Sequence, residues 1–175
     1  DAVVLTWWDS GYWVAAIAHR KTVVDNATLQ SDRIRDVAKI YLSTEEELAS
    51  NGLLQKYGIT HVVVYGTPEL WMGVAPPYML GDEAKWVSMA RIAGYSDAEI
   101  VGMISQNPRL MRLWLPREDT VLMKLILFGL YQHSPPLYRY VIGVEEPPSL
   151  KIFKLVYCSK SGHVFIYRVV SGETA

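Results

Sequence analysis

The sequence predicts an α+β (mixed α/β) fold, a helix-rich single domain with a small sheet and a C-terminal strand meander. Three observations lead to this prediction. In the first half of the chain, short apolar runs alternate with longer segments whose apolar residues share one helical face. From residue 138 onward, alternating segments are separated by turns at Pro147-Pro148 and Ser161-Gly162, which is typical of antiparallel strands. No linker divides the 175 residues, so we expect one domain, 1–175.

The first third of the chain is expected to hold a strand, a helix and a second short strand, at 2–6, 11–18 and 21–24. Two helices follow, at 31–42 and 44–57. Thr44 is the expected N-cap of the second helix, and Gly58 ends it. Acidic residues fill the first turn of that helix, where the helix dipole stabilises them.

The middle of the chain begins with a β-branched run that predicts a strand at 61–65. Pro68 then opens a loop that continues through Pro76 and Pro77. Further on, we expect helices at 82–93, 97–106 and 119–132, the last with Asp119 as its N-cap. The C-terminal meander would consist of strands at 138–144, 151–158 and 164–168.

Composition argues against several classes of function. With 17 basic and 18 acidic residues, the chain has no excess of positive charge for a nucleic-acid partner. Cys158 is the only cysteine and the four histidines have no ligand spacing, so we assign no metal or cofactor to the chain. The longest apolar stretch, 121–131, is interrupted by Lys124 and falls short of the ~20 residues of a bilayer span. Because the chain begins without Met, we expect it to be part of a longer protein.

A cluster of polar and aromatic residues, Trp7-Trp8-Asp9-Ser10-Gly11, directly follows the first apolar run. Two indole N–H donors and one carboxylate acceptor at the end of a strand can bind a single hydroxyl group, because an alcohol both accepts and donates a hydrogen bond. The alternative is a pair of core tryptophans beside a helix-capping Asp9. The cluster is therefore a candidate site for a small alcohol such as a Ser or Thr side chain.

A second pattern, Asp82, Lys85 and Met89, has the i, i+3, i+7 spacing of one helix face. These three residues can present an acid, a base and an apolar group together. The alternative is an ordinary surface ion pair beside a core methionine.

The two patterns together resemble the Trp-Trp-Asp-Tyr-Gly and Asp-x-x-Lys-x-x-x-Met/Ile motifs of the oligosaccharyltransferase catalytic subunit. That membrane enzyme transfers a glycan from a lipid carrier to Asn in Asn-X-Ser/Thr. Ser10 stands where the family has Tyr, and the resemblance covers about residues 1–95. It implies that 1–175 is the C-terminal globular domain of such a subunit, of archaeal type, and that it binds the acceptor polypeptide. The implied Ser/Thr pocket consists of Trp7, Trp8, Asp9, Lys85 and Met89, supported by Ser10, Gly11 and Asp82.

The resemblance also implies what lies outside this chain. The catalytic acids, a divalent Mn or Mg ion and the lipid-linked oligosaccharide would belong to a membrane domain, with the present domain on the extracytoplasmic side of the cell membrane. The chain itself has no nucleophile elbow, phosphate loop or His-Glu-x-x-His motif, so we assign it no catalytic residue and expect the isolated domain to be inactive. For the two motifs to form one pocket, Asp9 and Lys85 should share a surface, with Met89 pointing toward the tryptophans.

Other interpretations stay open at this point. A carbohydrate-binding module could stack sugars on Trp7, Trp8, Tyr12 and Trp13, and an interaction domain could dock on a membrane partner through Trp71-Met72 and Pro76-Pro77. Asn26-Ala27-Thr28 is itself an acceptor sequence for N-glycosylation. The alternative for that segment is a loop in which Thr28 caps the next helix.

Overall fold

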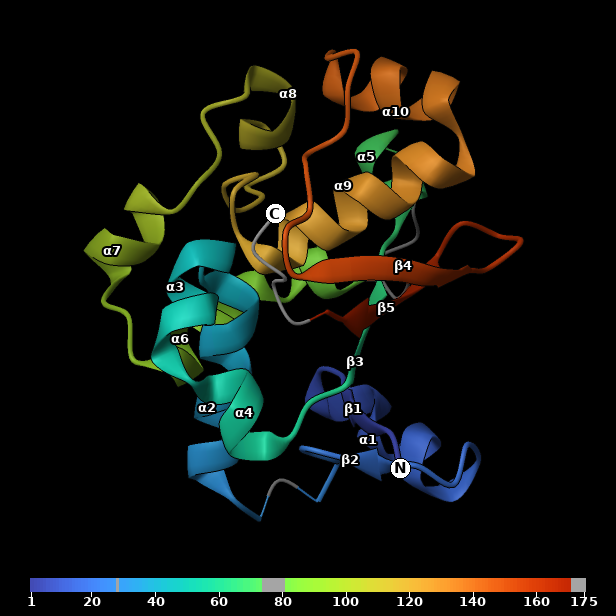
Figure 1. Ribbon diagram of the computed structural model, residues 1–175. Coiled ribbons are helices and arrows are strands. Elements are labelled where there is room, and N and C mark those ends of the chain that lie inside the picture. Colours follow the sequence, from blue (N-terminus) through green and yellow to red (C-terminus); the bar gives the residue numbers. More distant parts are fainter. Residues whose placement is uncertain (28, 74–80, 171–175) are drawn as a thin grey trace.

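A mixed five-stranded sheet organises the computed structural model, which describes residues 1–27, 29–73 and 81–170 (Figure 1). The strand order is β2-β1-β3-β5-β4. The first three strands in the chain run parallel, whereas β5 is antiparallel to both of its neighbours. The strands are β1 (Val3–Leu5), β2 (Lys21–Thr22), β3 (His61–Tyr65), β4 (Phe153–Cys158) and β5 (Val164–Val169). The predicted α+β class is thereby confirmed.

The helices of the first half are α1 (Trp8–Ala16), α2 (Ser31–Leu42), α3 (Glu45–Asn51) and α4 (Leu53–Tyr57). Helix α2 has the predicted bounds, and Thr44 caps α3 in a capping box with Glu47. The single helix predicted at 44–57 is wrong, because Gly52 adopts a left-handed conformation with φ of 71° and divides it into α3 and α4. Helix α1 begins earlier than predicted, so the tryptophan cluster forms its first turn rather than a preceding loop.

The next helices are α5 (Pro68–Trp71), the 3-10 helix η1 (Asp82–Ala84) and α6 (Trp86–Ala93). Helix α5 replaces the start of the predicted loop, whose Pro76 and Pro77 lie outside the described residues. The helix predicted at 82–93 is interrupted, since Lys85 separates η1 from α6.

The second half contains α7 (Asp97–Gly102), α8 (Pro108–Met111), α9 (Val121–His133) and α10 (Pro135–Ile142). Thr120, not Asp119, caps α9. The strand predicted at 138–144 is wrong: Ser134 caps α10, two prolines occupy its first turn, and Gly143 ends it. The predicted meander is thus reduced to the β4–β5 hairpin. Helix α7 ends at Gly102, which is short of the predicted boundary at 106.

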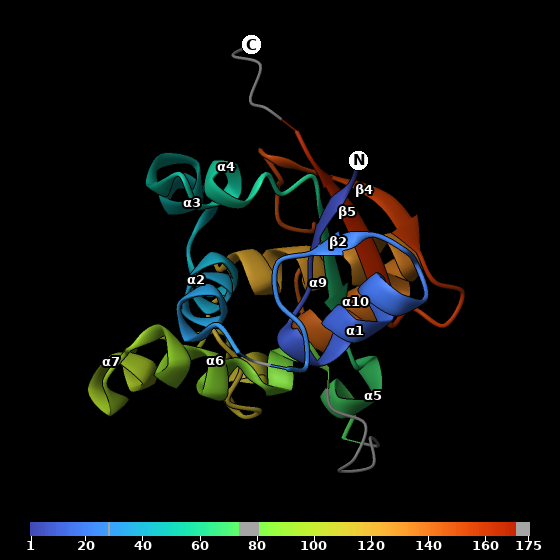
Figure 2. The same ribbon diagram turned by 90° about the horizontal axis from the view of Figure 1, so that it is seen from below.

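The core lies between one face of the sheet and α9, which packs on β3, β4 and β5, and it continues where α2 packs on α9 and α6 (Figure 2). Tyrosine hydroxyls connect these layers: Tyr41 donates to the carbonyl of Val63 over 2.9 Å, and Tyr167 to that of Leu125 over 2.6 Å. In the described part of the chain, no helix has the length and apolar character of a membrane span.

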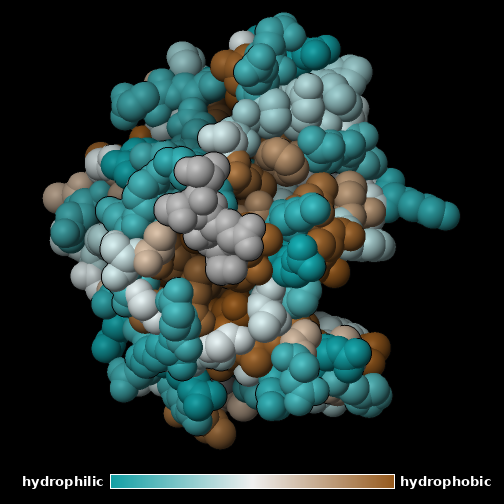
Figure 3. All heavy atoms as spheres, viewed as in Figure 1, coloured by the Kyte–Doolittle hydropathy of each residue, from teal (hydrophilic) through white to brown (hydrophobic). Residues whose placement is uncertain are grey.

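The other face of the sheet is only partly covered, because α1 lies against it at one side (Figure 1, Figure 2). An apolar trough of about 650 Å³ runs there between α1 and the strands β1, β3 and β5. Its walls include Trp13, Val63 and Ile166, with Ser10 at the first turn of α1. Figure 3 shows apolar residues around the indentation between α1 and the β4–β5 hairpin.

Candidate functional site

The fold brings the two sequence motifs into direct contact. Strand β1 ends at Leu5, and the chain enters α1 through Thr6 and Trp7, which are both buried. This entry places Asp9 in the first turn of α1, where the ammonium group of Lys85 donates a hydrogen bond to Asp9 Oδ2. Lys85 itself occupies the junction between η1 and α6. Residues that lie 76 positions apart in the sequence therefore form one polar site.

The two carboxyl oxygens of Asp9 differ in their hydrogen bonding. Its Oδ2 pairs with Lys85, whereas its Oδ1 is buried and accepts no hydrogen bond from any described residue. A buried acceptor without a donor costs about 1–3 kcal/mol, so the site gains that free energy when a donor reaches it. The side chains of Asp9 and Lys85 retain 30% and 28% exposure, so the pair borders the surface.

The two tryptophans have different environments. Trp7 is 2% exposed and packs in the core, which is the structural alternative considered for it. Trp8 is half-buried, with its ring centroid 6.5 Å from that of Trp7. Neither indole N–H donates a hydrogen bond to another described residue. Trp8 is thus the more exposed of the two indoles.

Asp82 is a second carboxyl group close to Lys85. The Asp82 side chain is 5% exposed, and its Oδ1 lies 3.8 Å from Lys85 Nζ. Its Oδ2 accepts the backbone N–H of Tyr65 over 2.9 Å, which attaches η1 to the end of β3. Burial raises the pKa of Asp82 to about 7, against the opposing effects of the Tyr65 N–H and the Lys85 ammonium. Lys85 therefore contacts one carboxyl group and lies near a second.

Glu83 is a buried acid that the sequence motifs do not identify. Its Oε1 accepts hydrogen bonds from the backbone N–H of Thr67 over 2.6 Å and from the indole of Trp71 over 3.1 Å. Burial raises the pKa of Glu83 to about 7. The Trp71 side chain belongs to this buried network and is only 2% exposed. A docking surface that includes the Trp71 ring is therefore contradicted. Met72 remains 41% exposed.

Met89 lies one turn into α6 and is completely buried. Helix α6 packs on α2, and Met89 belongs to the core cluster. The structure thus places it as an anchor for the helix that begins beside Lys85, which is the core alternative considered for this residue.

Ser10 and Gly11 complete the cluster in different ways. Ser10 is half-buried at the edge of the apolar trough. Gly11 is buried where α1 meets the chain after β2, and a Cβ there would overlap the carbonyl oxygen of Val24. A glycine is therefore required for this close approach. Within 1–27, 29–73 and 81–170, no three His, Cys, Asp or Glu side chains converge in a way that could hold a metal ion.

Comparisons with known proteins agree with the resemblance seen in the motifs. Residues 1–57 match the family model described as the STT3/PglB/AglB core domain. The STT3 subunit of the dolichyl-diphosphooligosaccharide–protein glycosyltransferase of Dictyostelium discoideum is 33% identical over 100 residues. Its Schizosaccharomyces pombe counterpart is 37% identical over 67 residues. These matches cover 57% and 38% of this chain but only 13% and 9% of the relatives, so the chain spans a small part of their length.

Solved structures show the same fold. Two crystal structures of the C-terminal globular domain of oligosaccharyltransferase from Archaeoglobus fulgidus superimpose with TM-scores of 0.59 and 0.51, at 22% sequence identity. Both alignments cover 97% of this chain, and they cover 85% and 80% of the archaeal domains. The likeness to these domains therefore extends along nearly the whole chain.

Proposed function

We propose that this chain recognises the acceptor polypeptide. It has the fold of an oligosaccharyltransferase C-terminal globular domain, and its residues 1–57 match the STT3/PglB/AglB core family model. In this proposal the Asp9–Lys85 site binds the hydroxyl group of the Ser or Thr in Asn-X-Ser/Thr. The enzyme as a whole would be a glycosyltransferase of the cell membrane, with this domain on the extracytoplasmic side.

The unpartnered Oδ1 of Asp9 is the observation that supports this proposal most directly. An alcohol would donate its proton to Oδ1, while its oxygen accepts from the indole N–H of Trp8. Lys85 occupies Oδ2 and thereby fixes the orientation of the carboxyl group. An acceptor without the hydroxyl would leave these groups unpaired, and sites built to bind a hydroxyl reject such analogues by about 10⁴- to 10⁵-fold.

The same geometry predicts a preference between the two natural acceptors. Met89 is buried, so the aliphatic stem of Lys85 is the apolar surface available to a threonine methyl group. Burial of one methyl group contributes up to ~0.8 kcal/mol, which corresponds to about a fourfold preference for Thr over Ser.

The chemistry of transfer is assigned to other parts of the enzyme. Catalytic acids, a Mn or Mg ion and the lipid-linked oligosaccharide would be held by the membrane domain, and this chain would contribute only binding and selection of the acceptor. The isolated chain is then expected to transfer no glycan. Transfer by this fragment alone would refute that assignment.

The test replaces Asp9 by Ala in the full-length enzyme and measures glycan transfer to a Thr-containing acceptor peptide. We expect at least a 100-fold loss of kcat/KM with an unchanged melting temperature. Asp97→Ala is the matched control, since Asp97 is an exposed acid whose 3.5 Å ion pair with Arg91 lies on another surface. Equal activity of the two variants would contradict the proposal.

Glycan binding by exposed aromatic residues is the competing function. Tyr12 and Trp13 are each 61% exposed, but their rings meet edge-on at 75° rather than forming a flat platform. Titration of the enzyme with the Thr peptide, its Ala analogue and a free oligosaccharide separates the two functions. Binding of the oligosaccharide alone, lost in Trp13→Ala, would favour the carbohydrate module.

A further inference from the structure

A single side chain joins the first turn of α1 to the segment that follows β2. The amide nitrogen of Asn26 donates to the backbone carbonyl of Asp9 over 3.2 Å, and the amide oxygen of Asn26 accepts the backbone N–H of Tyr12 over 3.3 Å. Asn26 thus contacts the main chain at Asp9 and at a residue three positions further on. Both contacts are made by a residue that is itself exposed.

The N-terminus of α1 lacks a side-chain cap. Its N-cap is Trp7, whose side chain forms no capping hydrogen bond, although the first N–H groups of a helix need an outside acceptor. Helix ends without such partners tend to fray. Asp9 lies in the first turn of α1, so the position of its carboxyl group depends both on Lys85, which pairs with Oδ2, and on the contacts that hold the turn in place.

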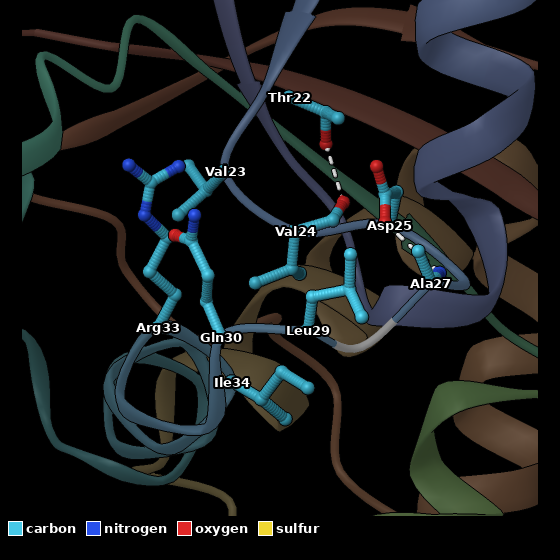
Figure 4. A pocket seen from close by; sticks show the side chains of 9 residues that line it. All are labelled: Thr22, Val23, Val24, Asp25, Ala27, Leu29, Gln30, Arg33 and Ile34. Atoms are coloured by element: carbon cyan, nitrogen blue, oxygen red, sulfur yellow. Dashed lines mark hydrogen bonds between the residues drawn. The ribbon is translucent and has the colours of Figure 1, made fainter.

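Hydrogen bonds within the segment that carries Asn26 keep it in place beside α1 (Figure 4). The hydroxyl of Thr22 donates to the carbonyl of Val24 over 2.8 Å, and Asp25 accepts the backbone N–H of Ala27 over 2.9 Å. The close approach of Val24 to Gly11 presses the segment against α1. A cavity of about 170 Å³ borders the segment, which is held by these bonds, by the Gly11 contact and by the buried side chains of Val23 and Val24.

We infer that Asn26 is a positioning residue for acceptor recognition: its amide fixes the first turn of α1 and thereby directs the Asp9 carboxyl toward Lys85 and the acceptor hydroxyl. The inference rests on the proposed function. Without the amide, the turn samples other arrangements. The apparent affinity for the acceptor then falls in proportion to the fraction of molecules in which the Asp9 carboxyl group is placed for binding. A tenfold drop in that fraction raises KM tenfold and leaves kcat within about twofold, because the bound complex is unchanged.

The test compares Asn26→Ala with two controls in the full-length enzyme. Thr28→Ala removes the acceptor sequence Asn26-Ala27-Thr28 but keeps the amide, so it separates positioning from glycosylation of Asn26. Asn51→Ala removes another exposed asparagine that accepts one backbone hydrogen bond, from Leu53. We expect a KM for the Thr peptide about tenfold above wild type in Asn26→Ala alone. Hydrogen exchange should also become faster at the Tyr12 amide.

Asn26→Asp adds a test of the donor. The substitution keeps an oxygen for the Tyr12 N–H but removes the N–H that the Asp9 carbonyl accepts, so KM should be raised as in Asn26→Ala.

Asp9→Ala in the same assay distinguishes failure of the positioning role from failure of the proposed function. If Asp9→Ala loses transfer and Asn26→Ala has a wild-type KM, the positioning role is overturned and the proposed function stands. If Asp9→Ala retains transfer, both are refuted. A KM rise in Thr28→Ala equal to that in Asn26→Ala would assign the effect to glycosylation and would also overturn the positioning role.

Discussion

Replacement of Gly11 by Ala tests the close approach between α1 and the chain after β2. A Cβ at this position would overlap the carbonyl oxygen of Val24 and lie 2.7 Å from the Cα of Asp25. Both obstacles are backbone atoms, which cannot rotate away. Overpacking typically costs about 1–3 kcal/mol, and the backbone contact places Gly11→Ala at the upper end of that range. The higher helix propensity of Ala offsets about 1 kcal/mol, so the net loss is about 2 kcal/mol.

The loss is measured as the midpoint of thermal unfolding by circular dichroism. For a domain of this size, about 2 kcal/mol lowers the melting temperature by roughly 4–8 °C. Gly102→Ala is the matched control, because Gly102 is also helical and a Cβ there would meet nothing within 4 Å. We expect Gly102→Ala to unfold at or above the wild-type temperature. If Gly11→Ala unfolds at the same temperature as Gly102→Ala, α1 does not need this contact and the packing argument is refuted.

Two further predictions concern buried residues near the site, Met89 and Glu83. Met89→Ala should lower the free energy of unfolding by about 2–5 kcal/mol in urea titrations, since it empties a fully buried position. Ile92 is 37% exposed on the same helix, so Ile92→Ala should lower this free energy clearly less. Equal losses in the two variants would contradict the core assignment of Met89. Burial raises the pKa of Glu83 from 4.5 to about 7, so the folded protein retains a proton that the unfolded chain releases. The free energy of unfolding should therefore fall between pH 4.5 and 7, by up to about 3 kcal/mol from this residue. Glu83→Gln should make this decrease in the free energy of unfolding smaller, and the contribution of Asp82 should remain. An unchanged pH dependence would show that Glu83 does not cause the decrease.

The sequence predicted elements well where pattern and capping agree. Helix α2 and strand β3 have their predicted bounds because each combines a complete apolar pattern with clear boundaries. In the segment that forms α10, alternating residues predicted a strand, whereas in the structure Ser134 caps a helix whose first turn holds two prolines. The local N-terminal signals and Gly143 determined the outcome.

The site was less accessible to sequence reasoning. The spacing of Asp82 and Lys85 is readable on one helix, but their meeting with Asp9 depends on how α1 and η1 pack, and only the family resemblance connected the two motifs. No sequence pattern predicted that Glu83 is buried, since its partners Thr67 and Trp71 are set by the tertiary fold. The contacts of Asn26 were not predicted either, because an Asn beside an Asp ordinarily indicates a turn.

The junction at Lys85 has a consequence for heat resistance. Helix α6 starts beside the ammonium group that reaches Asp9, and one turn later it buries Met89 in the centre of the domain. In the wild-type protein, where Asn26 also holds the first turn of α1, the polar site therefore cannot detach while the interior stays intact, in contrast to binding loops that open on their own. Loss of the Asp9–Lys85 contact on heating should coincide with global unfolding, in one cooperative transition. The upper temperature for recognition would then be that of the fold itself, so mutations that strengthen the interior would also extend the working range of the site.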